Sequence, residues 1–156
     1  MSNIYLAAPA AAREPVRSVA EYLTELGHIV TSSWLFDERT SINTAPTESD
    51  ERVRFLVERD LDDIARAKLV VLFSSDWCAR LGFLPQQTTS GGRHIETGYA
   101  LALGKQVIVV GQPENIFHRG ACAIVPDLNH LLPYLEQVPL PARKEEANES
   151  DTRRNP

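Results

Sequence analysis

Apolar residues follow two patterns along this chain. Short apolar or β-branched runs, most of which do not alternate with polar residues, predict strands, and continuous runs are typical of strands buried on both faces of a sheet. The runs are residues 3–8, 28–34, 68–74, 105–111 and, as an edge strand, 121–126. Apolar residues at helical spacing predict the helices between and after them, at 13–27, 47–67, 94–104 and 127–138.

This alternation of strands and helices predicts an α/β protein with helices on both faces of a parallel sheet. Five strands favour the doubly wound, flavodoxin-like order 2-1-3-4-5. Residues 1–140 are expected to form a single domain, followed by a disordered polar tail at 141–156. Ligands of such sheets bind beyond the carboxyl ends of the strands, so chemistry is expected after the first, third and fourth strands.

Composition narrows the function. The net charge of −5 and pI of about 5.4 argue against a partner such as a nucleic-acid polymer or an anionic membrane. Cys78 and Cys122 form no metal-ligand spacing, and we expect reduced thiols in a cytoplasmic protein. No signal peptide, membrane span, GxGxxG, P-loop or metal motif is evident, so no cofactor or metal is expected.

Glu96 is the first candidate for catalysis. It lies in the expected first turn of the helix over 94–104, just beyond the carboxyl end of a strand. Free N–H groups and the helix dipole favour an ionised carboxylate there, and such a carboxylate can attack a sugar C1. The simpler interpretation is that Glu96 only stabilises its helix. Gly91 and Gly92 favour the first interpretation, because they allow a ligand close to the backbone.

Asp60 and Tyr5 are further candidates. The stripe formed by Val53, Val57, Leu61 and Ile64 is expected to be buried. Asp60 lies about 50° from its centre, whereas Asp62 and Asp63 lie further round and are expected in solvent. Asp60 therefore serves either chemistry or an ion pair or cap. Tyr5, in the first strand, points its hydroxyl toward the ligand or simply packs.

Several residues are predicted to bind a substrate, with surface charge or packing as the alternative for each. Arg13, Arg93 and His94 can meet an anion, and Trp34 can stack on a base. The remaining candidates, each in or beside one of the three expected loops, are Ala7, Ser90, Asn115 and His118.

Three segments together resemble the nucleoside 2-deoxyribosyltransferase superfamily, which includes nucleoside transferases and deoxynucleoside 5′-monophosphate N-glycosidases. They are NIYLAAP, ERDLDDIARAKLVVLF and SGGRHIETGYALALGKQVIVV, and the resemblance spans residues 3–125. It implies a nucleophile at Glu96, an assisting acid at Asp60 and an orienting hydroxyl at Tyr5. It also implies a homodimer or higher homo-oligomer, in which a neighbouring subunit completes the site.

Three departures from the family pattern bear on the substrate. Ser90 stands where the transferases place an acid and the monophosphate hydrolases a serine, which favours a phosphorylated substrate. The phosphate loop of the hydrolases is replaced by AAPAAAR, in which Arg13 is the remaining anion partner. Residues 76–89 look like an insertion that forms a lid.

The sequence thus predicts an enzyme that cleaves the N-glycosidic bond of a (2′-deoxy)nucleoside or its 5′-monophosphate through a glycosyl-enzyme on Glu96. The intermediate is resolved by transfer to another base or by hydrolysis. The alternative is a domain of the same fold that binds or senses a nucleotide without turnover.

Overall fold

The computed structural model describes residues 1–37, 49–83 and 91–137. Its strands are β1 (Asn3–Ala7), β2 (Ile29–Val30), β3 (Leu69–Phe73), β4 (Gln106–Val110) and β5 (Ala123–Val125). Its helices are α1 (Arg13–Glu25), α2 (Asp50–Arg66), α3 (Ser75–Arg80), α5 (Gly92–Ala102), α6 (Ile116–Ala121) and α7 (Leu128–Gln137). Two 3-10 turns, η1 (Ala10–Ala12) and η2 (Ser33–Leu35), follow β1 and β2.

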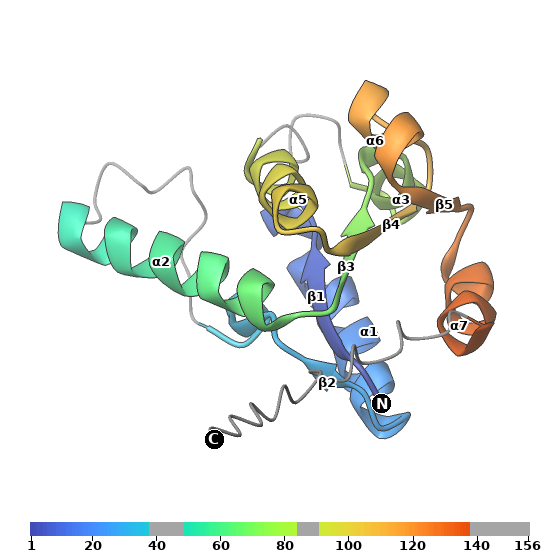
Figure 1. Ribbon diagram of the computed structural model, residues 1–156, viewed down its shortest axis with the longest axis horizontal. Helices are drawn as coiled ribbons and strands as arrows, with labels where there is room; N and C mark the ends of the chain where they lie inside the picture. Colours follow the sequence, from blue (N-terminus) through green and yellow to red (C-terminus); the bar gives the residue numbers. More distant parts are fainter. Residues whose placement is uncertain (38–48, 84–90, 138–156) are drawn as a thin grey trace, which may run out of the picture.

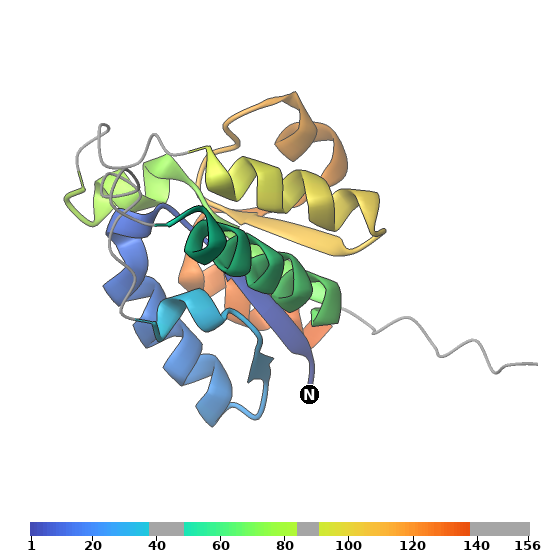
Figure 2. The same ribbon diagram turned by 90° about the vertical axis from the view of Figure 1, so that its left-hand side faces the viewer.

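The strands form one parallel sheet in the order β2-β1-β3-β4-β5, which confirms the predicted fold class. Helices α2 and α5 cover one face and α1 and α7 the other (Figure 1). Helices α2 and α5 contact each other and run side by side (Figure 2). The sequence order therefore brings the starts of α3, α5 and α6 to the carboxyl edge of the sheet.

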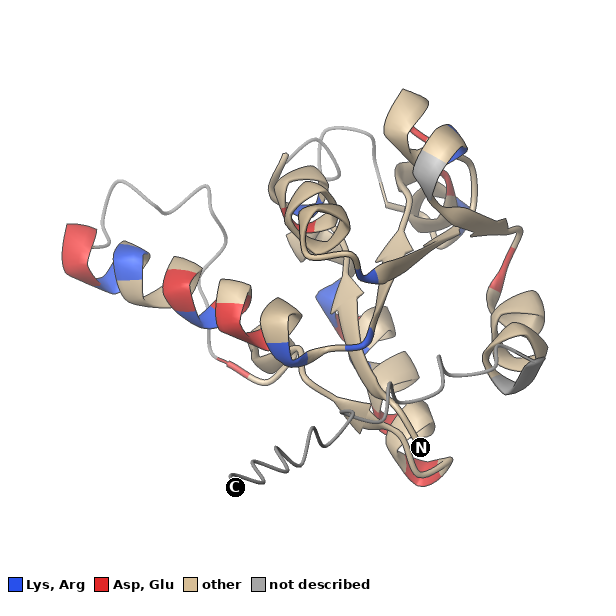
Figure 3. Ribbon diagram, in the orientation of Figure 1, with Lys and Arg blue, Asp and Glu red and all other residues tan. Residues whose placement is uncertain are grey.

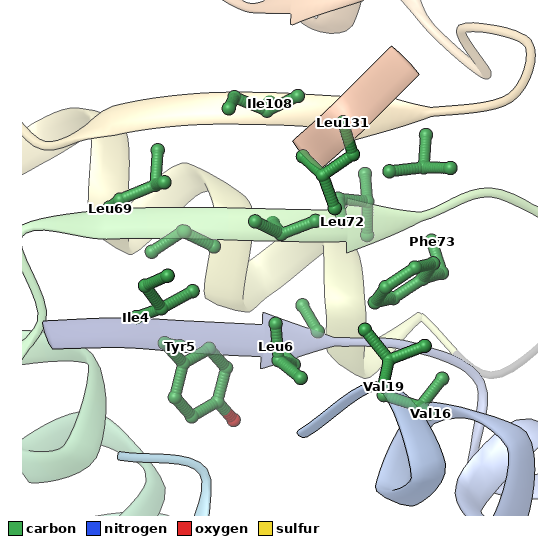
Figure 4. Packing of buried hydrophobic residues seen from close by; sticks show 14 of the residues in the cluster. Ile4, Tyr5, Leu6, Val16, Val19, Leu69, Leu72, Phe73, Ile108 and Leu131 are labelled. Carbon is green, nitrogen blue, oxygen red and sulfur yellow. The ribbon is translucent and has the colours of Figure 1, made fainter. Parts of the chain in front are cut away.

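The hydrophobic core is built on strands that carry no charged residues. Figure 3 shows acidic and basic residues alternating along α2, whereas the strands carry no charged residue. Leu6, Leu72 and Ile108 are fully buried within the sheet, and Val16 of α1 and Leu131 of α7 pack near them (Figure 4). Burying such side chains is the main term that stabilises the fold, at roughly 2 kcal/mol each.

Several boundaries differ from the prediction. Strand β2 is only Ile29–Val30, because Ser33–Leu35 turn into η2. The connection predicted after β3 begins with helix α3, where Ser74 caps the N–H of Trp77. The loop predicted after β4 contains α6, which is capped by Asn115. Short helices of this kind are set by one cap and tertiary packing, and they leave little periodicity in the sequence.

The stripe predicted on α2 is buried only at its end. Ile64 is fully buried, but Val53 and Val57 are 40% and 52% exposed. The Ser49 side chain caps the start of α2, since it accepts the N–H of Arg52. The first half of α2 projects beyond the sheet (Figure 1), so no strand lies beneath its apolar side. Of the insertion predicted at 76–89, residues 84–89 lie outside the described residues, as does the tail at 141–156.

No helix in the described part of the chain has both the length and the apolar character needed to cross a bilayer.

Candidate active site

A hydrogen bond joins the first strand to α5. The Tyr5 hydroxyl donates to Oε1 of Glu96 at 2.7 Å. Tyr5 is fully buried under α2 and α5, because it points to the face of the sheet that those helices cover. Two predicted catalytic residues that are 91 positions apart in the sequence therefore meet in the structure.

Glu96 does not lie in the first turn of its helix. Helix α5 begins at Gly92, with Gly91 as its N-cap, so Glu96 falls in the second turn. The N–H groups of His94 and Ile95 bond to the Gly91 carbonyl instead. The expectation that free N–H groups hold this carboxylate ionised is therefore wrong, and the Tyr5 hydroxyl is a donor that favours the charged form.

Asp60 lies at the edge of the buried face of α2, as predicted, and is half-buried. Its charge reaches Tyr5. Burial raises the pKa of Tyr5 well above its ordinary value, and the nearby charges of Glu96 and Asp60 raise it further. The hydroxyl therefore stays protonated at physiological pH and remains a donor. The structure thus places Tyr5, Glu96 and Asp60 in one electrostatic cluster.

Asp63 was expected in solvent and is instead fully buried. Its carboxylate accepts the N–H of Ser33 at 2.8 Å and the Ser33 hydroxyl at 2.6 Å, and it pairs with Arg66. The prediction was wrong because it used only the angular position of Asp63 around α2. It took no account of η2, which packs against the side of α2 that carries Asp63. Asp62 is exposed, as predicted. Asp63 thus fixes α2, and the turn that carries Asp60, to η2.

Three predicted binding residues hold the turn after β1. The Trp34 indole donates to the Leu6 carbonyl at 2.9 Å and is only 8% exposed. Arg13 donates from Nε to the Leu35 carbonyl at 3.1 Å. Ala7 ends β1 and is fully buried. Trp34 and Arg13 thus tie η2 to the end of β1 and the start of α1, and contact of these three residues with a substrate stays a prediction.

Arg93 lies in a buried ion pair. Its guanidinium donates to both oxygens of Glu114, at 2.9 and 3.2 Å, and to the Ser75 hydroxyl at 2.8 Å. The Arg93 side chain is 4% exposed and that of Glu114 is 16% exposed. Burial acts to raise the pKa of Glu114, but hydrogen bonds from Arg93 and Ser75 lower it to about 2. Glu114 is thus charged at all ordinary pH values.

Three other predicted residues line a separate pocket. His94, Asn115 and His118 border a cavity of about 600 Å³ between α5 and α6, together with the apolar side chains of Ile95, Leu101 and Phe117. His94 lies two residues from Glu96, which places it about 160° around α5. The cavity is therefore on the flank of α5 opposite Glu96.

The two histidines of this pocket are neutral at physiological pH. Burial lowers the pKa of both imidazoles, and the Arg93 charge lowers it further. His118 is 1% exposed, and its Nδ1 lies 3.2 Å from the Glu114 N–H. A neutral His118 therefore fixes the loop that carries Glu114.

Two solved structures share this architecture. A CMP N-glycosidase of Clostridium botulinum, BcmB, is 22% identical with a TM-score of 0.54, over 87% of this chain and 99% of that one. A 2-deoxyribosyltransferase of Bacillus psychrosaccharolyticus is 22% identical with a TM-score of 0.63, over 89% of this chain and 93% of that one. No protein-family model and no curated protein matches the sequence.

The chain shares the fold of these two enzymes. At the level of the fold, this confirms the resemblance carried by the three sequence segments. Within this fold, Glu96 lies on α5, which leads into β4, and Tyr5 lies on β1, which is paired between β2 and β3.

Two charged residues beside the candidate site were missed from the sequence. Glu114 and Asp63 are charged residues whose partners come from other elements. The signal for Glu114 was its place beside the strand end at Gly111, within a segment where only Asn115 and His118 were singled out. For Asp63 the sequence offers no comparable signal, because its burial depends on η2.

The structure says less about the remaining residues that the sequence singled out. Gly91 and Gly92 are exposed, and no atom lies within 4 Å of a Cβ added to either. They leave open space at the start of α5, as the predicted ligand approach requires. Ser90 lies outside the described residues. Burial raises the pKa of Cys78 to about 11, so this thiol is a poor nucleophile.

Proposed function

We propose that this protein cleaves the N-glycosidic bond of a nucleoside, a 2′-deoxynucleoside or a 5′-monophosphate of either. The hydrogen bond between Tyr5 and Glu96 is the observation that carries the proposal. A carboxylate held at 2.7 Å by a buried hydroxyl has a fixed orientation, which leaves its second oxygen to attack a sugar carbon. The shared fold with an N-glycosidase and a deoxyribosyltransferase supports this reading.

Glu96 acts as the nucleophile in this mechanism. One carboxylate oxygen forms a bond to C1′ while the bond from C1′ to the base nitrogen breaks, and the electron pair leaves with the base. Asp60 takes part in proton transfer: as the carboxylic acid it gives its proton to the departing base, and as the resulting carboxylate it accepts a proton from the incoming group. Water or a second base then attacks C1′ and releases the Glu96 carboxylate.

Tyr5 orients the nucleophile and does not supply the proton. Its raised pKa, caused first by burial and then by the charge of Glu96, keeps the phenol intact through the reaction. The hydrogen bond also selects one carboxylate oxygen, so the other is directed at the sugar. A carboxylate held in this orientation attacks more readily than one that rotates freely.

Two neighbours and two residues support the proposed substrate class. One neighbour is named for CMP, a nucleoside monophosphate, and the other for 2-deoxyribosyl transfer. Ser90 favours a 5′-monophosphate, with Arg13 as its cationic partner. Hydrolysis and transfer share the same first step, so the mechanism allows both reactions.

Base release tests the proposal. Wild type, Glu96→Ala and Asp62→Ala are incubated with a panel of ribo- and deoxyribonucleosides and their 5′-monophosphates, and free base is measured by chromatography. Asp62 is the matched control, because it is an exposed acid that pairs with Arg66 at 3.1 Å. We expect release by wild type and Asp62→Ala and loss of at least a hundredfold in Glu96→Ala.

Equal activity of the two variants would overturn the mechanism. Tight binding of an intact nucleotide without release by wild type would instead support the binding or sensing domain.

A further inference from the structure

Arg93 stands on α5 three residues before Glu96, and its side chain leaves the helix toward the sheet. Of the three predicted anion partners, it is the most deeply buried, at 4% exposed. A buried guanidinium is costly unless every donor is directed at an acceptor. The contacts of Arg93 therefore indicate the structural role of this buried side chain.

Those contacts join three elements. Arg93 belongs to the first turn of α5, Ser75 begins α3 after β3, and Glu114 lies in the loop between β4 and α6. Glu114 accepts from the Ser75 N–H at 2.8 Å as well as from two nitrogens of Arg93. The forked geometry fixes both the distance and the rotation of the guanidinium relative to the carboxylate.

The partners of Arg93 are themselves fixed. The carbonyl of Arg93 accepts the Thr97 hydroxyl at 2.8 Å, one turn further along α5. Glu114 is held by its N–H contact to His118, and Asn115 caps the first turn of α6. The cluster of Arg93, Ser75 and Glu114 is thus a rigid junction at the carboxyl edge of β3 and β4.

Rotation of α5 is what this junction controls. Residues of a helix are about 100° apart, so Arg93 and Glu96 differ by about 60° around α5. Fixing Arg93 against Ser75 and Glu114 therefore fixes the angle at which Glu96 meets Tyr5. A small rotation or slide of α5 would move Oε1 of Glu96 out of hydrogen-bond range of the Tyr5 hydroxyl.

We propose that Arg93 and Glu114, with Ser75, form a positioning junction that sets α5 so that Glu96 is directed at the substrate by Tyr5. This inference rests on the proposed function. It assigns Arg93 a task in the protein scaffold, in place of the anion contact predicted from the sequence. Misplacement of a reacting atom by about 1 Å can cost a hundredfold in rate, so such a junction matters for turnover.

The kinetic test uses Glu114→Gln, Arg93→Lys and Ser75→Ala. We expect kcat to fall about tenfold to a hundredfold in Glu114→Gln while KM changes less than about threefold, because binding groups stay while the nucleophile is displaced. Arg93→Lys retains the charge but loses the fork, so a smaller loss is expected. Ser75→Ala keeps the ion pair, and it is the variant of choice should Glu114→Gln fail to fold; we expect a fall of about threefold.

Asp76→Asn is the control. Asp76 neighbours Ser75 on α3 and forms an exposed ion pair with Arg80 at 3.3 Å. Its neutralisation should leave kcat unchanged. The proposal would be overturned if Glu114→Gln raised KM and left kcat unchanged. Equal kcat in Ser75→Ala, Glu114→Gln and Asp76→Asn would overturn it as well.

A crystal structure of Glu114→Gln separates this proposal from the proposed function. We expect the distance from the Tyr5 hydroxyl to Oε1 of Glu96 to lengthen from 2.7 Å to beyond hydrogen-bond range. An unchanged distance would overturn the junction even where wild type releases base. A lengthened distance in a protein that releases no base would uphold the junction and reject the reaction.

Discussion

The Tyr5 hydroxyl joins strand β1 to the carboxylate on α5. It donates at 2.7 Å from a fully buried ring. A hydrogen bond to a charged group contributes about 1.5–3 kcal/mol, and here that contribution falls on the proposed nucleophile. The most sensitive single-residue changes should therefore be those that remove this donor and leave the fold intact.

Tyr5→Phe is the first prediction. Without the donor, the oxygens of Glu96 are less ordered, so kcat/KM for base release should fall about tenfold to a hundredfold. Tyr22→Phe, on an exposed tyrosine of α1, should leave kcat/KM unchanged. An unchanged kcat/KM in Tyr5→Phe would show that the hydroxyl does not act on the nucleophile.

Glu114 provides a prediction about stability against pH. Its pKa is lowered from 4.5 to about 2, so its contribution to stability is complete above pH 4.5 and is lost as the pH falls toward 2. Urea unfolding at pH 6 and pH 3 should show wild type losing about 2 kcal/mol more than Glu114→Gln between these values. Glu21→Gln, which alters an exposed pair with Arg17, should follow wild type. Parallel losses in all three would contradict the assignment.

At this scale the sequence predicted which residues of the candidate site meet, but it did not predict all of the interactions that hold them. Tyr5, Asp60 and Glu96 were singled out from strand position, helix angle and family resemblance. The donor that favours the ionised Glu96 was expected from the helix terminus and proves to be Tyr5, because α5 begins at Gly92. Asp63 and Glu114 depend on contacts between distant segments, which local periodicity does not report.

At the scale of elements, the turn after β4 shows how tightly the carboxyl edge is packed. Gly111 has φ of +98°, and a Cβ there would lie 2.2 Å from the Ser74 hydroxyl and 3.2 Å from Trp77. Its N–H bonds to the Val125 carbonyl at 2.8 Å. The turn that leads to Glu114 is therefore compatible only with glycine.

Gly111→Ala tests this packing. Backbone strain at positive φ and the clash with Ser74 should lower the free energy of unfolding by about 2 kcal/mol or more. Gly98→Ala is the matched control, since a Cβ there meets no atom within 4 Å and alanine favours the helix by about 1 kcal/mol. Urea unfolding should therefore show opposite signs for the two substitutions. A neutral Gly111→Ala would mean that the turn adapts.

The elements themselves were predictable to the extent that their pattern is local. All five strands and the helices α1, α2, α5 and α7 follow from apolar runs and helical spacing. Helices α3 and α6 have six residues each, which is too short for a period to register. They are set by the caps of Ser74 and Asn115 and by tertiary contact.

For the whole molecule, α2 exposes an apolar side. Val53 and Val57, which lie about 40° apart around the helix, are 40% and 52% exposed on a helix whose first half extends beyond the sheet (Figure 1). The helical pattern had predicted burial of Val53 and Val57. Apolar side chains gathered on one projecting element are typical of a protein interface. We therefore propose that this surface contacts a second copy, in line with the homo-oligomer that the sequence resemblance implies.

Sedimentation velocity tests the assembly. Wild type should sediment as a dimer or larger oligomer, and the double variant Val53→Asp/Val57→Asp as a monomer, because buried charges oppose association. Tyr22→Asp, which changes a similarly exposed apolar side chain on α1, should sediment like wild type. A monomeric wild type, or an oligomer unaffected by the double variant, would contradict this assignment.

The central claim is that Glu96 becomes covalently attached to the sugar. Wild type is mixed with excess 2′-deoxynucleoside or its 5′-monophosphate, quenched in acid within the first turnover, and analysed by intact-mass spectrometry and peptide mapping. The account predicts a deoxyribosyl adduct, with or without phosphate, on the peptide that contains Glu96, and no adduct in Glu96→Gln. Base release by wild type with no adduct, together with undiminished release by Glu96→Gln, would contradict it.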